Sequence, residues 1–225
     1  MRRTLWALTV AGVSLQLACG GGASVSPPGT SAGGAAPGER AINRFREPPA
    51  ELLPELDDVA LHERDILAFG PADAPTIVLV YTDWKCPHCE AAWPRMQALA
   101  GARDDVQVRY RSFPLSGPCN DTLEVRDESR CTLAKAALCA NEEGGFVDFA
   151  PAAYALPDAV LAQSAWSGVS MTACMADAAM DEVLQDHIRL GQDLELSGTP
   201  TFFLRRAGQW FGPLNVEQVV NELGG

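Results

Sequence analysis

Two cysteines separated by two residues, at the junction of a predicted strand and a predicted helix, constrain this chain more than any other feature. The apolar run from Thr76 to Tyr81 predicts a buried strand, and Cys86-Pro87-His88-Cys89 follows it and opens a predicted helix. Pro87 suits the first helical position, where its missing N–H leaves no hydrogen bond unmade. Thiols three positions apart can form a disulfide, and the N–H groups of a helix start favour a thiolate at the first of them. The spacing therefore predicts a dithiol–disulfide redox centre.

Two other interpretations of this cysteine pair are half of a zinc site and a purely structural disulfide. Zinc requires a second pair of ligands at short spacing. The cysteines after position 89 lie 12, 8 and 35 residues apart, and the three histidines are scattered along the chain. Their spacing favours redox chemistry over a zinc site.

Three separated motifs give the chain a family resemblance. They are the Pro-His pair between the cysteines, Pro94 five residues after Cys89, and Thr199-Pro200 at the start of an apolar strand. With these motifs the chain resembles the DsbA-type disulfide oxidoreductases of the thioredoxin superfamily, from about Val59 to the C-terminus. The resemblance implies an α/β protein, a thioredoxin fold with a helical domain inserted between core strands, and an enzyme that exchanges disulfides with other proteins.

The resemblance also implies roles for the four residues of the motif. Cys86 is expected to be the exposed nucleophile and Cys89 the buried resolving thiol, with Pro87 between them at the helix start. His88 is expected to help stabilise the Cys86 thiolate, although it could instead be a solvated residue with little influence. The redox-active disulfide needs no further cofactor, and no metal is expected.

Three more residues are expected near this centre. Thr199 and Pro200 match the segment that faces the active site in the superfamily, where a cis-proline leaves backbone free for a substrate strand; the alternative is an ordinary turn proline. Trp84 is placed to line a substrate groove or, equally well, to pack in the core. Many relatives carry a buried carboxylate six residues before the first cysteine, but here that position is Val80, and Asp83 lies closer to the surface.

The N-terminus predicts export. Residues 1–18 have a basic start and an apolar stretch too short to span a bilayer, followed by Cys19. This resembles a bacterial lipoprotein signal that is lipidated at Cys19, although Gln16 stands where that motif prefers an aliphatic residue. The alternative is an ordinary secretory signal cleaved near Ala18. Residues 19–57 predict a tether rich in Gly, Ser and Pro, and residues 58–225 the DsbA-like domain.

Periodicity outlines the elements of this domain. Strands are predicted around 59–66, 105–112 and 201–206, and a helix from Val216 with Asn215 as its N-cap. The helical insertion is expected at about 114–196, with breaks at the glycines and prolines within it. His187 lies on an apolar stripe of the last insertion helix, which indicates a packed core histidine rather than a catalytic one.

Four further cysteines suggest two structural disulfides in an exported chain. Cys131 and Cys139 lie on one predicted helix about 12 Å apart along its axis, and a disulfide tolerates a Cα separation of roughly 7 Å. Two connectivities remain. The one that pairs Cys119 with Cys131 and Cys139 with Cys174 is preferred, because it closes a short loop onto a helix and ties two helices together. Buried free thiols are the alternative.

These observations together predict an exported, lipid-anchored thiol:disulfide oxidoreductase on the periplasmic side of a bacterial membrane, acting as an oxidant. Its expected partners are exported proteins with thiols or disulfides and a membrane redox protein. The net charge of −12 argues against nucleic acid and against direct binding to an anionic membrane. The alternatives are a dedicated reductase of the same fold, a lipoprotein that binds copper through Cys86, His88 and Cys89, and a non-catalytic chaperone.

Overall fold

The computed structural model describes residues 54–57, 59–161, 165–166 and 169–224. The predicted signal segment, Cys19 and nearly all of the predicted tether lie outside the described residues. Among the described residues, we find no helix with the length and apolar character that crossing a bilayer requires.

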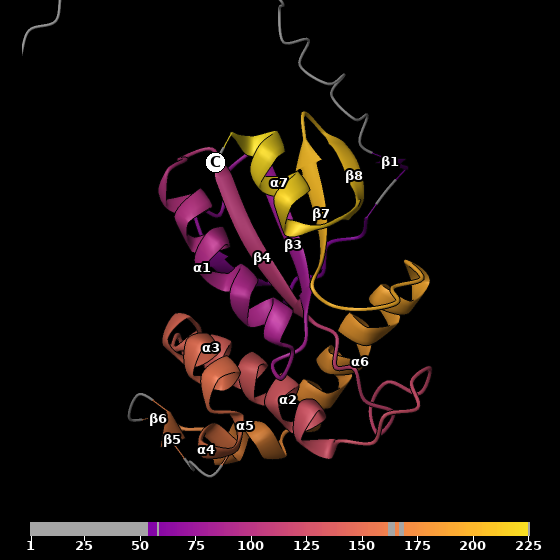
Figure 1. Cartoon of the computed structure of the whole chain (residues 1–225). Coiled ribbons are helices and arrows are strands. Elements are labelled where there is room, and N and C mark those ends of the chain that lie inside the picture. Colours follow the sequence, from indigo (N-terminus) through magenta and orange to yellow (C-terminus); the bar gives the residue numbers. More distant parts are fainter. Residues whose placement is uncertain (1–53, 58, 162–164, 167–168, 225) are drawn as a thin grey trace, which may run out of the picture. The chain divides into compact units, whose positions relative to one another are not determined.

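A six-stranded mixed sheet forms the centre of the domain (Figure 1). Its strands in spatial order are β1 (Glu55–Leu56), β8 (Gln209–Leu214), β7 (Thr201–Arg206), β3 (Thr76–Thr82), β4 (Val106–Ser112) and β2 (Ile66–Phe69). Only β3 and β4 are parallel, as expected for two strands joined by a crossover helix. All seven residues of β3 are buried, because it lies between β4 and β7 and both its faces are covered.

The helix α1 (Pro87–Gly101) makes the crossover from β3 to β4. It begins with proline at its first turn and buries one face against the sheet, with Trp93 and Met96 at its centre. The C-terminal helix α7 (Val216–Leu223) packs against α1 on the same face of the sheet (Figure 1). Asn215 and Gln218 form the predicted capping box at its start. The N-terminus of α1 is thus held at the carboxyl end of β3.

Among the described residues, five helices follow β4 and precede β7, in the part of the sequence where the insertion is predicted. They are α2 (Glu128–Glu142), α3 (Phe146–Ala155), α4 (Pro157–Leu161), α5 (Thr172–Ala176) and α6 (Ala178–Asp193). A two-stranded ribbon, β5 (Ala165–Trp166) and β6 (Val169–Ser170), lies among them and was not predicted. Figure 1 shows these helices grouped beyond the end of the sheet at which α1 begins.

Two disulfides hold the insertion together. Cys119, in the loop before α2, is bonded to Cys131, and Cys139 is bonded to Cys174 of α5. This is one of the two connectivities that the sequence leaves open. Both bonds use α2, which is therefore fixed near its start and near its end.

The first part of the domain differs from the sequence-based expectation. The strand predicted around 59–66 is wrong, because residues 62–65 form a turn in which Asp65 N donates to His62 O and the Asp65 carboxylate accepts from His62 N. The strand β2 starts only at Ile66. In addition, β1 pairs with β8 and so adds residues to the sheet ahead of the predicted boundary at 58.

A buried ion pair fastens this turn to the sheet. Arg111 of β4 is fully buried and pairs with Asp65, which is 5% exposed, and it donates to Tyr81 Oη at 2.6 Å. His187 of α6 lies beside them in the core, as its apolar stripe predicts, with Nε2 3.8 Å from the Asp65 carboxylate. Neither ring nitrogen of His187 has a hydrogen-bond partner in the described part of the chain. Burial lowers the pKa of His187 well below 6.5, so its ring is neutral.

Candidate active site

The two cysteines of the motif meet where β3 ends and α1 begins. Cys86 is the N-cap residue of α1, and its carbonyl oxygen accepts the backbone N–H groups of Cys89 and Glu90, both at 3.1 Å. Both thiols are free. Cys86 is only 7% exposed and Cys89 only 2%. The expectation of an exposed Cys86 is therefore wrong, because the segment around Thr199 covers its sulfur.

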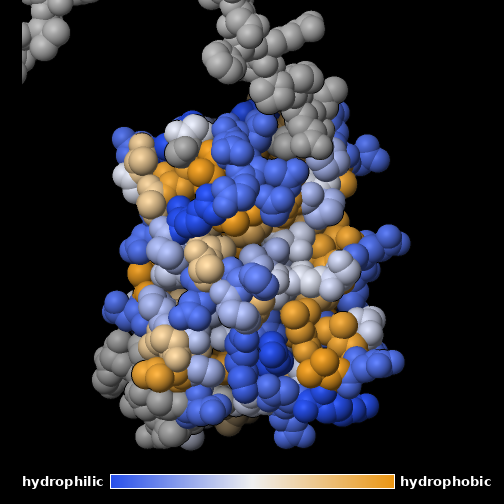
Figure 2. Space-filling view, in the orientation of Figure 1, coloured by the Kyte–Doolittle hydropathy of each residue, from blue (hydrophilic) through white to orange (hydrophobic). Residues whose placement is uncertain are grey.

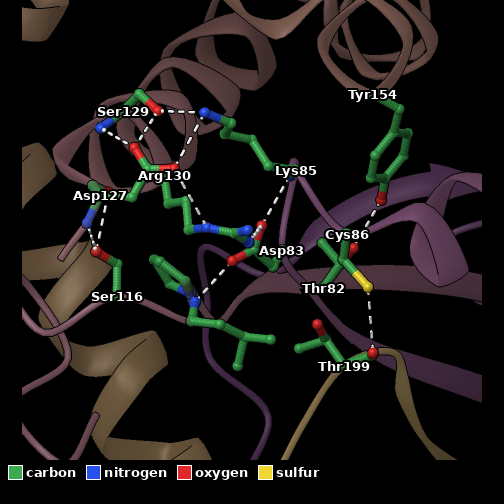
Figure 3. Close-up of polar contacts among 12 residues, drawn as sticks. Thr82, Asp83, Lys85, Cys86, Ser116, Asp127, Ser129, Arg130, Tyr154 and Thr199 are labelled. Atoms are coloured by element: carbon green, nitrogen blue, oxygen red, sulfur yellow. Dashed lines mark hydrogen bonds and ion pairs between the residues drawn. The ribbon is translucent and has the colours of Figure 1, made fainter. Parts of the chain in front are cut away.

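The segment Thr199-Pro200 lies directly against Cys86. Its peptide bond is cis, and the thiol of Cys86 donates to the Thr199 carbonyl oxygen at 3.3 Å (Figure 3). Thr199 Oγ1 is buried, and the Thr199 side chain lowers the pKa of both thiols. Thr199 and Pro200, 113 residues and more along the chain from Cys86, are thus placed where the sequence predicts them, at the redox pair.

The environment of Cys86 favours its thiolate. The pKa of Cys86 is lowered from 9.0 to about 5, chiefly by a hydrogen bond from the Cys89 side chain. The backbone N–H of Cys89, the Thr199 side chain and the backbone N–H of His88 add to the lowering, while burial opposes it. The side chain of His88 itself is exposed. Its contribution comes from the backbone at the helix start, so the expectation that the imidazole stabilises the thiolate is not supported.

Cys89 has the opposite character. Burial raises its pKa far above the ordinary 9.0, and the interaction with Cys86 raises it further. The Thr82 side chain, the backbone N–H of Asp83 and the Thr199 side chain act in the other direction with smaller effect. At neutral pH the reduced pair therefore consists of a Cys86 thiolate and a neutral Cys89 thiol. A thiolate can act as a nucleophile, as Cys86 would here, whereas a neutral buried thiol such as Cys89 suits a resolving role.

Trp84 does not line a groove. It is 1% exposed, its indole Nε1 donates to Ser112 Oγ at 3.2 Å, and its ring centroid lies 5.0 Å from that of Tyr154. The core-packing alternative for Trp84 is correct and the proposed substrate contact is wrong. The exposed residues of the motif are Pro87 and His88.

A buried carboxylate that the sequence analysis placed near the surface organises the turn before Cys86. Asp83 is 1% exposed and accepts from the backbone N–H groups of Lys85 at 2.7 Å and Leu115 at 2.6 Å. Its charge is paired with Arg130 of α2 at 2.8 Å. With these partners its carboxylate is fully engaged, and it acts on Cys89 only through its backbone N–H. Asp83 does not replace the carboxylate that relatives have at the position of Val80.

The same network fastens the start of α2 to the active-site turn (Figure 3). Lys85 pairs with Asp127 at 3.0 Å and donates to Ser129 Oγ at 2.8 Å. Asp127 is the N-cap of α2 and accepts from Ser129 N. Sequence reasoning missed this network, since its partners are more than 40 residues apart. The one local signal for it in the sequence is Asp127 at a helix start, followed three positions later by the basic residue Arg130.

Two pockets of more than 300 Å³, both formed by described residues, lie away from Cys86 and Cys89. One, of about 330 Å³, lies between α1 and α7 and is mostly apolar, with Leu99 and Leu223 in its lining and Arg95 and Arg103 at its edge. Figure 2 shows apolar surface between hydrophilic groups at the level of these two helices. The other, of about 430 Å³, is polar and includes Cys119. Within the described ranges, no group of three or more His, Cys, Asp or Glu side chains could hold a metal ion.

Comparisons with known proteins agree with this geometry. Residues 77–141 match the family model of the DSBA-like thioredoxin domain. Among solved structures, a thioredoxin-like oxidoreductase from Silicibacter pomeroyi is similar, with a TM-score of 0.58 and 22% identity over 72% of this chain and 92% of that one. BdbD from Bacillus subtilis gives a TM-score of 0.58 and 16% identity over 76% and 97%. DsbA2 from Pseudomonas aeruginosa gives 0.52 and 21% over 72% and 93%.

Two curated proteins are also similar in sequence. The Na⁺/H⁺ antiporter NhaA 3 of Salinispora tropica is 28% identical over 191 residues, and NhaA 1 of Salinispora arenicola is 26% identical over 193 residues. In both cases the match covers 79% of this chain but only 26% of the relative, so the chain spans about a quarter of their length.

Proposed function

We propose that the chain is a protein-disulfide oxidoreductase of the DSBA-like thioredoxin family, whose model matches residues 77–141. We further propose that it exchanges disulfides with exported proteins through Cys86 and Cys89 and acts as an oxidant. The observation that carries the proposal is the pair of opposite pKa shifts at the start of α1. The pKa of Cys86 is lowered to about 5, whereas that of Cys89 is raised.

The charge on Cys86 supports the proposed direction of exchange. Only the reduced form has a free Cys86 sulfur, so every contact that favours the thiolate favours the reduced protein over the disulfide. The disulfide is then easily opened by a substrate thiolate. Attack on Cys86 Sγ forms a mixed disulfide and releases Cys89, and a second substrate thiol then displaces Cys86 and leaves the substrate oxidised.

The buried position of Cys86 narrows the manner of substrate binding. With Cys86 7% exposed and its thiol against Thr199 O, a substrate has to approach over Pro87 and His88 and come close to the Thr199-Pro200 segment. An extended segment fits this approach best, because its backbone groups can bond to those of residues near 199. We therefore propose unfolded or flexible exported chains as substrates.

The reduction potential of the Cys86–Cys89 pair, measured by equilibration with glutathione, tests the proposal. A value near −120 mV supports an oxidant and a value near −270 mV a reductant. Cys86→Ser provides the control, since it removes the nucleophile and retains the fold. Oxidation of a reduced, unfolded substrate by the wild type and not by Cys86→Ser is expected. Failure of both proteins to oxidise the substrate above the uncatalysed rate would refute the proposal and leave a chaperone role.

Export and anchoring through Cys19 are part of the same proposal. Family relatives act on exported proteins, and two disulfides in the insertion suit an oxidising compartment. Metabolic labelling with a radioactive fatty acid should label the full chain and leave Cys19→Ser unlabelled. Absence of label on the wild type would favour a soluble exported protein.

A further inference from the structure

Two buried hydroxyl groups form a hydrogen bond next to the resolving thiol. Thr82 Oγ1, at the end of β3, lies 2.6 Å from the phenolic oxygen of Tyr154 in α3 (Figure 3). Thr82 is fully buried and Tyr154 is 7% exposed, although 72 residues separate them in the sequence. Tyr154 is held in place by aromatic neighbours, with Trp84 at 5.0 Å and Trp93 at 6.2 Å between ring centroids.

The Thr82 hydroxyl acts on Cys89 through a side-chain hydrogen bond that lowers the pKa of the Cys89 thiol. Both residues are buried, Thr82 at 0% and Cys89 at 2% exposed. Two side chains among the described residues lower the pKa of Cys89, and both carry hydroxyl groups: Thr82 and Thr199. The carboxylate of Asp83 is taken by Arg130 and two backbone N–H groups. A charge that develops on the Cys89 sulfur is therefore met by hydroxyl groups and not by an acid or base.

We propose that Thr82, oriented by Tyr154, donates a hydrogen bond to the Cys89 sulfur when that sulfur becomes negatively charged during exchange. With the phenol of Tyr154 donating to Thr82 Oγ1, the hydroxyl hydrogen of Thr82 is free for the sulfur. Thr82 is then a catalytic residue, because it touches a reacting atom, and Tyr154 is a positioning residue. The inference rests on the proposed function, since it concerns the step in which the Cys86–Cys89 bond opens and closes.

The electron balance of that step shows where the hydrogen bond acts. A substrate thiolate attacks Cys86 Sγ, a new S–S bond forms, the Cys86–Cys89 bond breaks, and its electron pair leaves on Cys89 Sγ. When the second substrate thiol attacks the mixed disulfide, Cys86 leaves as a thiolate and the proton of that thiol ends on Cys89. In the reverse direction Cys89 must be a thiolate to attack. In both directions negative charge collects on Cys89 in the transition state, where a fixed donor is most effective.

Tyr110 offers a matched control for Tyr154. It is also a buried tyrosine, 1% exposed, and its ring lies 5.1 Å from that of Trp93. Its hydroxyl has no hydrogen-bond partner among the described residues. Tyr110→Phe and Tyr154→Phe thus remove the same atom from the same aromatic cluster, but only the second breaks a hydrogen bond.

The experiment measures the two rates of exchange with glutathione by acid quenching and mass spectrometry, from pH 6 to 8. One rate is the opening of the protein disulfide to the mixed disulfide, and the other is its closure by Cys89. We expect Thr82→Val to slow both rates at least tenfold, equivalent to about 1.4 kcal/mol. Thr82→Ser should stay within about threefold of the wild type, since it keeps the donor. Tyr154→Phe should be slower than the wild type, and Tyr110→Phe should match it.

The reduction potential separates this role from a structural one. Cys89 is neutral in both stable forms of the protein, so Thr82→Val should change the two rates by the same factor and leave the potential unchanged. Rates within twofold of the wild type in Thr82→Val, or a Thr82→Ser variant as slow as Thr82→Val, would overturn the inference. Should Thr82→Val fail to fold, equal rates for Tyr154→Phe and Tyr110→Phe would overturn it. A wild-type protein that does not react with glutathione would overturn the proposed function first.

Discussion

The thiol of Cys89 is the largest single cause of the lowered pKa of Cys86, and this leads to a direct prediction. Replacing Cys89 by alanine removes a hydrogen bond to a charged sulfur, which is worth about 1.5–3 kcal/mol. Because one pKa unit corresponds to about 1.4 kcal/mol, the pKa of Cys86 should rise by about 1 to 2 in Cys89→Ala. Cys89→Ser keeps a donor at the same place and should leave the pKa close to that of the wild type.

At pH 7 the lowered pKa of Cys86 stabilises the reduced protein relative to its disulfide. A thiol with a pKa of 9.0 is about 1% ionised at pH 7, and one with a pKa of about 5 is about 99% ionised. The difference favours the reduced protein by about 3 kcal/mol, or about 60 mV in reduction potential. The stabilisation is complete above pH 9, where an ordinary thiol is also ionised, and it is lost as the pH falls through 5. The difference in potential between this pair and an ordinary dithiol should therefore shrink as the pH falls through 5.

Absorbance of the thiolate at 240 nm against pH, together with the rate of alkylation by iodoacetamide, measures the Cys86 pKa in each variant. The reduced wild type should titrate near 5. A wild type that titrates near 9 would refute the role assigned to the helix start and Cys89. A Cys89→Ala variant that titrates as low as the wild type would show that the Cys89 thiol is not the main donor.

Three further substitutions, with Gly101→Ala as a control for one of them, test the core and the active-site turn by urea denaturation. His187→Leu should be at least as stable as the wild type at pH 7, because both ring nitrogens lack partners. From pH 6.5 to 5 the wild type should lose about 2 kcal/mol relative to it, since only the unfolded histidine gains a proton; parallel pH profiles would contradict this. Gly191→Ala should cost about 1–3 kcal/mol, because its Cβ would lie 2.5 Å from the Phe113 ring. Gly101→Ala, with open space, should cost nothing. Arg130→Met should cost about 3 kcal/mol, because it leaves the buried carboxylate of the active-site turn unpaired; an unchanged midpoint would argue against this.

Much of the fold could be predicted because its signals are local. The buried run at 76–82, the proline at the first turn of α1 and the capping box at Asn215 each depend on neighbouring residues only. The exclusion of a Cys131–Cys139 disulfide needed only the rise of a helix. The strand predicted around 59–66 was wrong because a side chain to backbone turn at His62 competes there with an extended conformation.

The parts of the active site that could be predicted are also those with local signals in the sequence. The redox pair and Thr199-Pro200 are visible as motifs, but the burial of Cys86 and Trp84 is not, since it depends on segments that fold over them from elsewhere in the chain. The pairs Asp83–Arg130 and Thr82–Tyr154 join β3 to helices of the insertion. Such contacts depend on how the insertion packs on the sheet, and the periodicity of the sequence does not predict this packing.

The two disulfides of α2 place a condition on how this protein is made. Its α2 helix is bonded at Cys131 and Cys139, and the residue beside the first of them, Arg130, neutralises Asp83 in the active-site turn. A newly synthesised copy that still has four thiols in the insertion lacks these fixed points. These four thiols have to be oxidised before α2 gains its fixed points, so the protein itself depends on disulfide formation, the chemistry that it is proposed to perform.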